Sequence, residues 1–219
     1  MGSGAAKRLA SSRVAVFGLG GVGGHAVEAL ARSGVGAIDI VDKDIFEETN
    51  LNRQLGALRS TLGKRKTEVF KERILDINPE CTVTVHDMFY LPENADEIDL
   101  SVFDYVIDAV DTVTAKICLV ERAMAAGTPI ICSMGTGNRL DPSKLFVTDI
   151  QKTKDDPLAR DVRKALRQRG INHVKCVCSS ELPVKCGQTP GSTAFVPAAA
   201  GLLLASEAVK DIIYKNETS

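Results

Sequence analysis

The sequence contains no apolar run long enough to cross a bilayer, and its first residues lack the positively charged start and apolar stretch of a secretory signal. These absences disfavour a membrane protein and a secreted protein. The sequence also has no internal repeat and no low-complexity linker. With 219 residues, 44% hydrophobic and 25% charged, it has the length and composition of one globular domain over residues 1–219, which we expect in the cytoplasm.

The sequence has little excess charge of either sign. Lys and Arg number 27 and Asp and Glu number 28, which gives a net charge of -1. This balance disfavours a protein that binds nucleic acid over a broadly basic surface. A local basic patch is still enough to contact a phosphate backbone, so any nucleic-acid surface should be confined to one segment.

The cysteines lack the spacing of a zinc site. Such sites commonly use two separated C-x-x-C pairs, whereas Cys176 and Cys178 are one residue apart and no second pair is present. In a strand these two side chains point to the same face, so a thiol pair or a partial metal site is an alternative. We favour free thiols in a reducing compartment for all six cysteines: Cys81, Cys118, Cys132, Cys176, Cys178 and Cys186.

Apolar segments alternate with helical patterns along the chain, which is typical of a doubly wound sheet. We expect strands at 14–17, 37–41, 82–86, 105–109, 129–133, 146–150 and 174–178, and helices at 23–33, 64–78, 114–126, 158–169 and 198–214. The sequence thus predicts an α/β protein with a Rossmann-like, mostly parallel sheet. Ligands of such sheets bind at the carboxyl ends of the strands.

Gly18, Gly20 and Gly23 have the G-x-G-x-x-G spacing between the first expected strand and the first expected helix. This spacing lets a strand turn sharply into a helix whose free backbone N–H groups face a phosphate. Asp42 ends the second strand, where an acidic side chain can hydrogen-bond ribose hydroxyls. These features alone fit a nicotinamide-dependent oxidoreductase as well as an enzyme that uses ATP.

The segment after Asp42 distinguishes these two alternatives. It places Asp44, Asn50, Asn52 and Arg53 close together in the sequence. An arginine fork neutralises phosphate oxygens, amide side chains add donors, and a second carboxylate can help to hold a metal ion. Hydride transfer needs none of these groups, so the segment favours polyphosphate chemistry.

Together with Gly21, Lys66 and Asp111, these residues make the chain resemble the ubiquitin-activating-type adenylating enzymes over residues 13–213. Within that family, the segments 77–81, 106–111, 147–150 and 152–158 resemble the tRNA threonylcarbamoyladenosine dehydratases most closely. The resemblance implies an ATP-dependent enzyme that adenylates the threonyl carboxylate of threonylcarbamoyladenosine in tRNA. Cyclisation of the modified nucleoside with loss of water would follow.

The resemblance also implies residue roles. Asp42 would hold the ribose of ATP, Arg53 and Lys66 would hold the phosphates, and Asp111 would bind magnesium near the reacting phosphate. We therefore expect Arg53, Lys66 and Asp111 to be catalytic. The complete expected ATP site comprises Gly18, Gly20, Gly21, Gly23, Asp42, Asp44, Asn50, Asn52, Arg53, Lys66 and Asp111.

The same resemblance implies a homodimer. Family members carry an arginine ahead of the first strand that often reaches the ATP of the neighbouring subunit, and Arg8 is the candidate for that position here. A cysteine-desulfurase or sulfur-carrier partner is left open.

Other functions remain as alternatives. The main one is the same adenylation step on the C-terminal carboxylate of a sulfur-carrier or ubiquitin-like protein, which would favour zinc-binding cysteine pairs. A nicotinamide-dependent oxidoreductase and a non-catalytic nucleotide sensor are further alternatives that the glycine motif allows.

The helix expected at 158–169 has an apolar face and a strongly cationic face. The cationic face consists of Arg160, Arg163, Lys164 and Arg167, which are spaced three and four residues apart. A solvated surface is the ordinary explanation for such a stripe. Because like charges at these spacings destabilise a helix, we hypothesise that the four cations contact tRNA phosphates.

Overall fold

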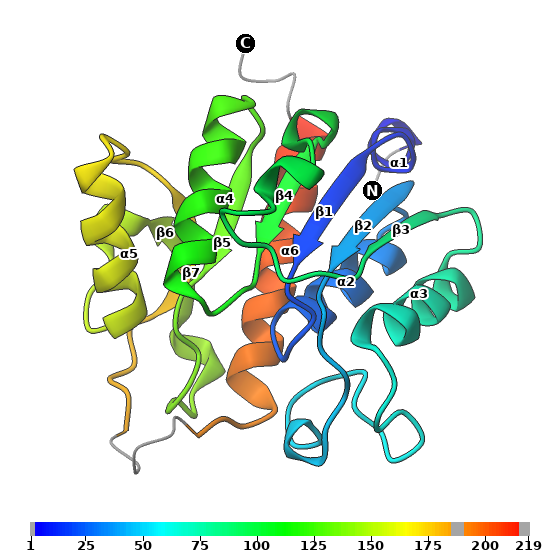
Figure 1. Cartoon of the computed structure of the whole chain (residues 1–219), viewed down its shortest axis with the longest axis horizontal. Helices are drawn as coiled ribbons and strands as arrows, with labels where there is room; N and C mark the ends of the chain where they lie inside the picture. The colour runs from blue at the N-terminus through cyan, green and yellow to red at the C-terminus, as the bar shows by residue number, and fades with distance from the viewer. Residues whose placement is uncertain (1–2, 185–190, 215–219) are drawn as a thin grey trace.

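The computed structural model describes residues 3–184 and 191–214, and a seven-stranded sheet with the order β3-β2-β1-β4-β5-β7-β6 forms its centre (Figure 1). The strands are β1 (Arg13–Phe17), β2 (Ala37–Val41), β3 (Thr82–His86), β4 (Tyr105–Asp108), β5 (Ile130–Ser133), β6 (Leu145–Asp149) and β7 (Lys175–Ser179). Neighbouring strands are parallel except β6 and β7, which pair antiparallel. The predicted α/β fold with a mostly parallel sheet is confirmed.

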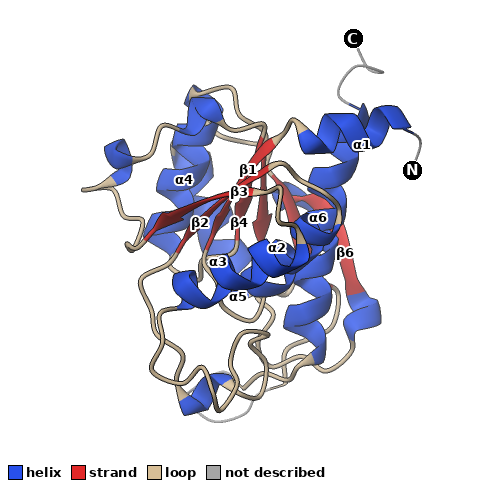
Figure 2. Cartoon of the chain, turned by 90° about the vertical axis from the view of Figure 1, so that its right-hand side faces the viewer, coloured by secondary structure: helices blue, strands red, loops and turns tan. Residues whose placement is uncertain are grey.

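Helices cover both faces of the sheet (Figure 2). They are α1 (Ser3–Ala10), α2 (Gly23–Arg32), α3 (Lys66–Ile77), α4 (Val113–Ala125), α5 (Pro157–Gln168) and α6 (Phe195–Tyr214). Successive strand residues point to opposite faces, so Val16 packs in the core with α2, α3 and α6, while Phe17 packs on the other face with Leu119 of α4. Val162 and Leu166 of α5 extend the core on that second face.

The strand register brings the carboxyl ends of four strands to one edge of the sheet. Phe17 at the end of β1 pairs with Val41 of β2 on one side and with Asp108 of β4 on the other, and Asp108 pairs with Cys132 of β5. The strand order reverses between β1 and β4. In open α/β sheets this switch point is where loops part and a ligand crevice forms.

The predicted strands agree with the structure to within a residue at each end, and the predicted helices to within a few residues. Helix α1 and the short 3-10 turns were not predicted, because the small residues around α1 show no clear apolar period. Burial of Leu9 and packing against α6 hold α1 in place, and the Leu9 carbonyl accepts a hydrogen bond from the Gly36 N–H at 3.0 Å. Its stability therefore comes from tertiary contacts. No helix in the described ranges is both long and apolar enough to span a membrane.

Candidate functional site

A cavity of about 840 Å³ lies at the carboxyl ends of β1, β2, β4 and β5. The glycine loop after β1 and the segment from Asp42 to Gln54 form one side, and residues 133–137 after β5 form the opposite wall. All the expected ATP-site residues line this cavity except Gly23 and Asn52. The structure therefore brings together residues from the loops after β1, β2 and β4 and from the start of α3.

Gly18, Gly20 and Gly21 line the cavity, whereas Gly23 lies behind the loop. Gly18 has a φ of +87°, and a Cβ on it would lie 2.7 Å from the carbonyl oxygen of Ala109. A Cβ on Gly23 would lie only 1.7 Å from the carbonyl oxygen of Gly18. Gly23 therefore permits close packing between α2 and the loop, and does not itself border the cleft.

Asp42 connects the end of β2 to the glycine loop. Its Oδ2 accepts a hydrogen bond from the Leu19 N–H at 2.6 Å, and its Oδ1 accepts one from the Asp44 N–H at 2.8 Å. The residue is 8% exposed. Because each carboxylate oxygen can accept two hydrogen bonds, Asp42 can still accept one from a ligand hydroxyl in the cleft.

Lys66 provides a buried positive charge at the start of α3. Its side chain is 6% exposed, and Nζ lies 2.8 Å from Asp44 Oδ2 and 3.9 Å from Asp42 Oδ2. The Lys66 N–H also donates to the Asp44 carbonyl at 3.0 Å. An anionic ligand in the cleft would compete with Asp44 for the lysine ammonium.

The side chain of Arg53 is oriented by its neighbours. Its Nη1 donates to the Thr49 carbonyl and to Asn52 Oδ1, both at 2.9 Å. Asn52 in turn donates from Nδ2 to the Ser192 carbonyl at 2.9 Å, so it holds the arginine and does not line the cleft. Asn50 does line the cleft, and its Oδ1 accepts from the Glu47 N–H at 3.1 Å, which closes the turn ahead of the arginine.

Asp111 lies exposed on the cleft wall after β4. On either side of it in the chain, Asp108 at the end of β4 and Lys116 on α4 form an ion pair of 2.8 Å in which both side chains are 0% exposed. Asp108 Oδ1 also accepts a hydrogen bond from the Val110 N–H at 3.1 Å. The buried pair thus fixes the start of the loop that carries Asp111. No pattern in the sequence predicts a role for Lys116.

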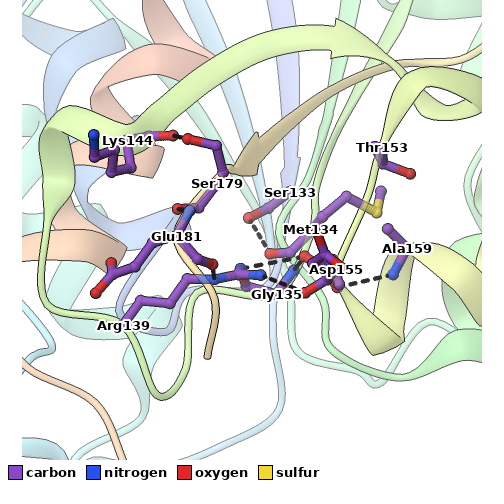
Figure 3. Close-up of polar contacts among 12 residues, drawn as sticks. Ser133, Met134, Gly135, Arg139, Lys144, Thr153, Asp155, Ala159, Ser179 and Glu181 are labelled. Carbon is purple, nitrogen blue, oxygen red and sulfur yellow. Dashed lines mark hydrogen bonds and ion pairs between the residues drawn. The ribbon is translucent and has the colours of Figure 1, made fainter. Parts of the chain in front are cut away.

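Two further features of the cleft were missed. Gln54 is 7% exposed and lines the cavity, and its buried Oε1 has no hydrogen-bond partner among the described residues. Buried acceptors are nearly always satisfied, so this oxygen is suited to a ligand N–H or O–H. Behind the opposite wall, Arg139, which Figure 3 labels, forms a second buried ion pair with Asp156. A lone loop arginine carries no sequence signal for burial.

The expected cationic face of α5 is divided by the structure. Arg160 and Lys164 are exposed, and Arg160 Nε lies 3.0 Å from Asp161 Oδ1 in a pair that solvent screens. Arg163 is half-buried and donates from Nη1 to the Thr153 carbonyl at 2.8 Å and to Thr153 Oγ1, so it supports the turn before the helix. Arg167 is exposed, but its Nε donates a hydrogen bond to Gln151 Oε1, in the turn before α5, at 2.7 Å. The expectation that all four cations share one open face is wrong for Arg163, because helical spacing does not report what a neighbouring segment contacts. The contact with tRNA phosphates stays a hypothesis.

The cysteines in the described part of the chain are free thiols: Cys81, Cys118, Cys132, Cys176 and Cys178. Cys176 and Cys178 lie on the same buried face of β7, as the strand alternation predicts, and Cys186 lies outside the described residues. A hydrogen bond with Cys178, together with burial, raises the pKa of the Cys176 thiol. Within residues 3–184 and 191–214, no group of three or more His, Cys, Asp or Glu side chains is placed to hold a metal ion.

Comparison with known proteins identifies the family. The model of the ThiF family matches residues 1–219. The chain belongs to the ThiF family. This ThiF-family chain is 44% identical to the tRNA threonylcarbamoyladenosine dehydratase of Bacillus subtilis (strain 168), over 94% of the chain and 88% of the relative. The predicted family membership is therefore confirmed.

Solved structures give the same result for the fold of the ThiF-family chain. The E. coli tRNA N6-threonylcarbamoyladenosine dehydratase TcdA in complex with ATP has a TM-score of 0.93 and 40% identity, covering 99% of this chain and 91% of that one. Its complex with AMP has a TM-score of 0.94 and 39% identity, covering 100% and 92%. The resemblance thus extends over nearly the whole of both chains.

Proposed function

We propose that this chain is an ATP-dependent tRNA threonylcarbamoyladenosine dehydratase. The observation that carries the proposal is the near full-length similarity to the E. coli dehydratase in complex with ATP, which coincides with a cleft lined by the expected ATP-site residues. The nicotinamide alternative is disfavoured, because the same cleft contains Arg53, Lys66 and Asp44.

The residues of the cleft fit ATP. Gly18, Gly20 and Gly21 leave room for phosphates beside the N-terminus of α2, whose backbone N–H groups favour an anion. Asp42 accepts hydrogen bonds from the ribose hydroxyls. Arg53 and Lys66 place two positive charges beside the phosphates. The unpartnered Gln54 Oε1 accepts a hydrogen bond from the nucleoside, a contact that would satisfy this buried atom.

Asp111 is the proposed magnesium ligand. Its carboxylate is exposed on the cleft wall, and Mg²⁺ is commonly held by one or two carboxylates together with substrate phosphates. The donor set therefore fits a metal that binds with the nucleotide. When bound, magnesium would neutralise charge on the phosphate oxygens.

The proposed reaction has two steps. An oxygen of the threonyl carboxylate attacks the α-phosphorus of ATP, so a P–O bond forms, the bond to the β-phosphate oxygen breaks, and pyrophosphate leaves. A nitrogen of the same modification then attacks the acyl carbon, AMP leaves, and the nitrogen loses its proton. The substrate has lost one water. Arg53 and Lys66 stabilise the negative charge that develops on the phosphates in the first step.

We also propose the remaining features that the resemblance implies. The chain acts as a single adenylating domain, in the cytoplasm and as a homodimer. Arg8 lies on α1 beside the groove with α6, at the opposite end of the sheet from the chain's own cleft, so it would serve only a neighbouring subunit. The proposal does not require a sulfur-transfer partner, and such a partner is left open.

The function is tested by incubating the protein with MgATP and tRNA that carries threonylcarbamoyladenosine, and following the modified nucleoside by mass spectrometry after gentle digestion. We expect an ATP-dependent loss of one water. If the nucleoside is unchanged although the tRNA is intact and the protein binds ATP, the tRNA substrate is wrong. Adenylation of a carrier protein is then the function to test.

The exposed cations of α5 provide a prediction about tRNA. Reversing Arg160 and Lys164 together to Glu should weaken tRNA binding at least about tenfold, because phosphate contacts dominate affinity. The slope of log Kd against log salt should also fall by about one or two. Affinity for ATP should not change. Filter binding over a salt series measures both quantities.

The matched control reverses Arg32 and Lys71, which lie on α2 and α3 on the other face of the sheet and give the same change in net charge. An equal loss of affinity in both double variants would show only a net-charge effect. That result, or no loss in either, would remove α5 from the tRNA surface.

A further inference from the structure

The wall of the cleft after β5 is built around the buried side chain of Arg139, which is 2% exposed (Figure 3). Its Nη1 donates to the Gly135 carbonyl and to Asp156 Oδ2, the latter at 3.2 Å. Nε donates to the Glu181 carbonyl at 3.1 Å, and Nη2 to the Asp155 carbonyl at 3.4 Å. One guanidinium thus joins three segments of chain that are far apart in sequence.

Asp156 connects the same wall to α5. Its Oδ2 accepts from the Gly135 N–H at 2.9 Å, and its Oδ1 accepts from the Ala159 N–H at 3.0 Å, as the N-cap of the helix. A Cβ on Gly135 would lie 3.1 Å from Asp156 Oδ1, so glycine allows this close approach. The carboxylate therefore sets both the position of the wall and the start of α5.

The backbone beside this pair is strained and tightly held. Asn138 and Asp155, which directly precede Arg139 and Asp156, have φ values of 58° and 53°, and no other non-glycine residue in the described ranges has a positive φ. Asn138 is held by Gly191, whose N–H donates to Asn138 Oδ1 at 2.7 Å and whose carbonyl accepts from the Asn138 N–H at 2.7 Å. Such strain persists where the surrounding contacts over-determine the conformation, and it clusters at functional sites.

The position of this wall indicates what it contacts. Asp42 and the glycine loop place the nucleotide over β1 and β2, so the part of the cavity over β4 and β5 is left for the second substrate. Gly135, Thr136 and Gly137 border that part. The exposed cations Arg160 and Lys164 lie on α5, within about two helical turns of Asp156, the N-cap of that helix.

We infer that Arg139 and Asp156 are positioning residues for the acceptor substrate. They hold residues 135–137 against the modified nucleoside, and they fix that wall relative to the helix that contacts the tRNA backbone. The assignment rests on the proposed function. Neither residue lines the cavity, and both act through the backbone of the wall. Loss of the pair shifts the threonyl carboxylate relative to the α-phosphorus, and misplacement by about 1 Å can cost about 10²-fold in rate.

The test is Arg139→Lys, which keeps the charge but cannot make the same set of contacts as the guanidinium fork. We expect kcat for dehydration of tRNA to fall at least about tenfold, within the range that misplacement allows. The KM for ATP and the number of ATP sites per chain should stay at the wild-type values. A loss of folded protein would lower the number of sites, so this split separates positioning from a general structural effect.

Two companion variants complete the experiment. Gly135→Ala displaces the wall from Asp156 without unpairing a buried charge, and should give the same split if Arg139→Lys does not fold. Arg13→Lys is the control, because Arg13 makes a bidentate pair with buried Asp39 at 2.8 and 2.9 Å at the opposite end of the sheet. It should retain the wild-type kcat.

The outcomes are distinguishable. If the wild type dehydrates tRNA and a folded Arg139→Lys or Gly135→Ala protein does so with unchanged kcat, the assignment is wrong and the proposed function stands. An equal fall in kcat for Arg13→Lys would likewise overturn the assignment. If the wild type dehydrates no tRNA, the proposed function is wrong and the assignment falls with it.

Discussion

Replacing Arg53 with alanine is expected to lower kcat for ATP-dependent dehydration by about 10²- to 10³-fold, the cost typical of losing a preorganised group that stabilises developing charge. The guanidinium borders the cleft, and its Nη1 is already fixed by the Thr49 carbonyl and Asn52 Oδ1. It therefore needs little reorganisation when charge builds up on the α-phosphate. Steady-state kinetics at saturating ATP, with pyrophosphate release as the readout, measures the effect.

Arg59→Ala is the matched control for this prediction. Arg59 follows in the same part of the chain, but its side chain is 83% exposed and its nearest acidic oxygen, on Glu48, is 3.9 Å away. Its replacement should leave kcat within about twofold, since exposed pairs of this kind contribute little. Turnover by Arg53→Ala within a few-fold of the wild type would count against adenylation by this cleft.

Asn52→Ala tests whether the orientation of Arg53 contributes to its effect. Asn52 does not line the cleft, yet it orients Arg53 and binds the Ser192 carbonyl. Its effect on kcat should be smaller than that of Arg53→Ala, and the double variant should cost little more than Arg53→Ala alone. Residues that act through one another are non-additive in this way.

The side of the cleft that follows β1 and β2 was predictable because its determinants are local in sequence. Gly18 and Asp42 each follow an apolar strand directly, so the alternation of strands and helices places both at one edge of the sheet. Arg53 and Lys66 were predicted to bind phosphates because they accompany the glycine motif and the acidic and amide residues after β2. The sequence could not distinguish Gly23 from the cleft glycines, since its tight contact with Gly18 appears only when α2 packs.

The wall after β5 was not predictable for a different reason. The Arg139–Asp156 pair joins two loops. Asp156 lies in segment 152–158, which carries part of the family resemblance, but nothing in either loop marks its charge as buried. The same holds for Arg163, whose helical spacing indicated a solvent-facing cation, while a turn preceding α5 in fact covers it. Sequence patterns report which side chains share a face, but loop contacts depend on the assembled fold.

Lys116→Met is expected to lower the free energy of unfolding by about 3–5 kcal/mol, the usual cost of breaking a buried ion pair by removing one partner. Lys116 Nζ lies 2.8 Å from Asp108 Oδ2, and both side chains are 0% exposed. Methionine fills similar volume but leaves the Asp108 carboxylate buried without its counter-charge. Urea denaturation followed by far-UV circular dichroism measures the loss.

The double variant Asp108→Asn with Lys116→Met separates the effect of charge from that of packing. The asparagine introduced in place of Asp108 has no charge to leave unpaired, and its side-chain oxygen can still accept from the Val110 N–H, as Asp108 does at 3.1 Å. We expect the double variant to recover at least half of the lost stability, because neutral or apolar replacements of buried pairs are often tolerated. Equal destabilisation of the single and double variants would mean that shape, and not charge pairing, holds the loop that carries Asp111. If the prediction holds, the buried pair stabilises the same loop that presents the proposed magnesium ligand.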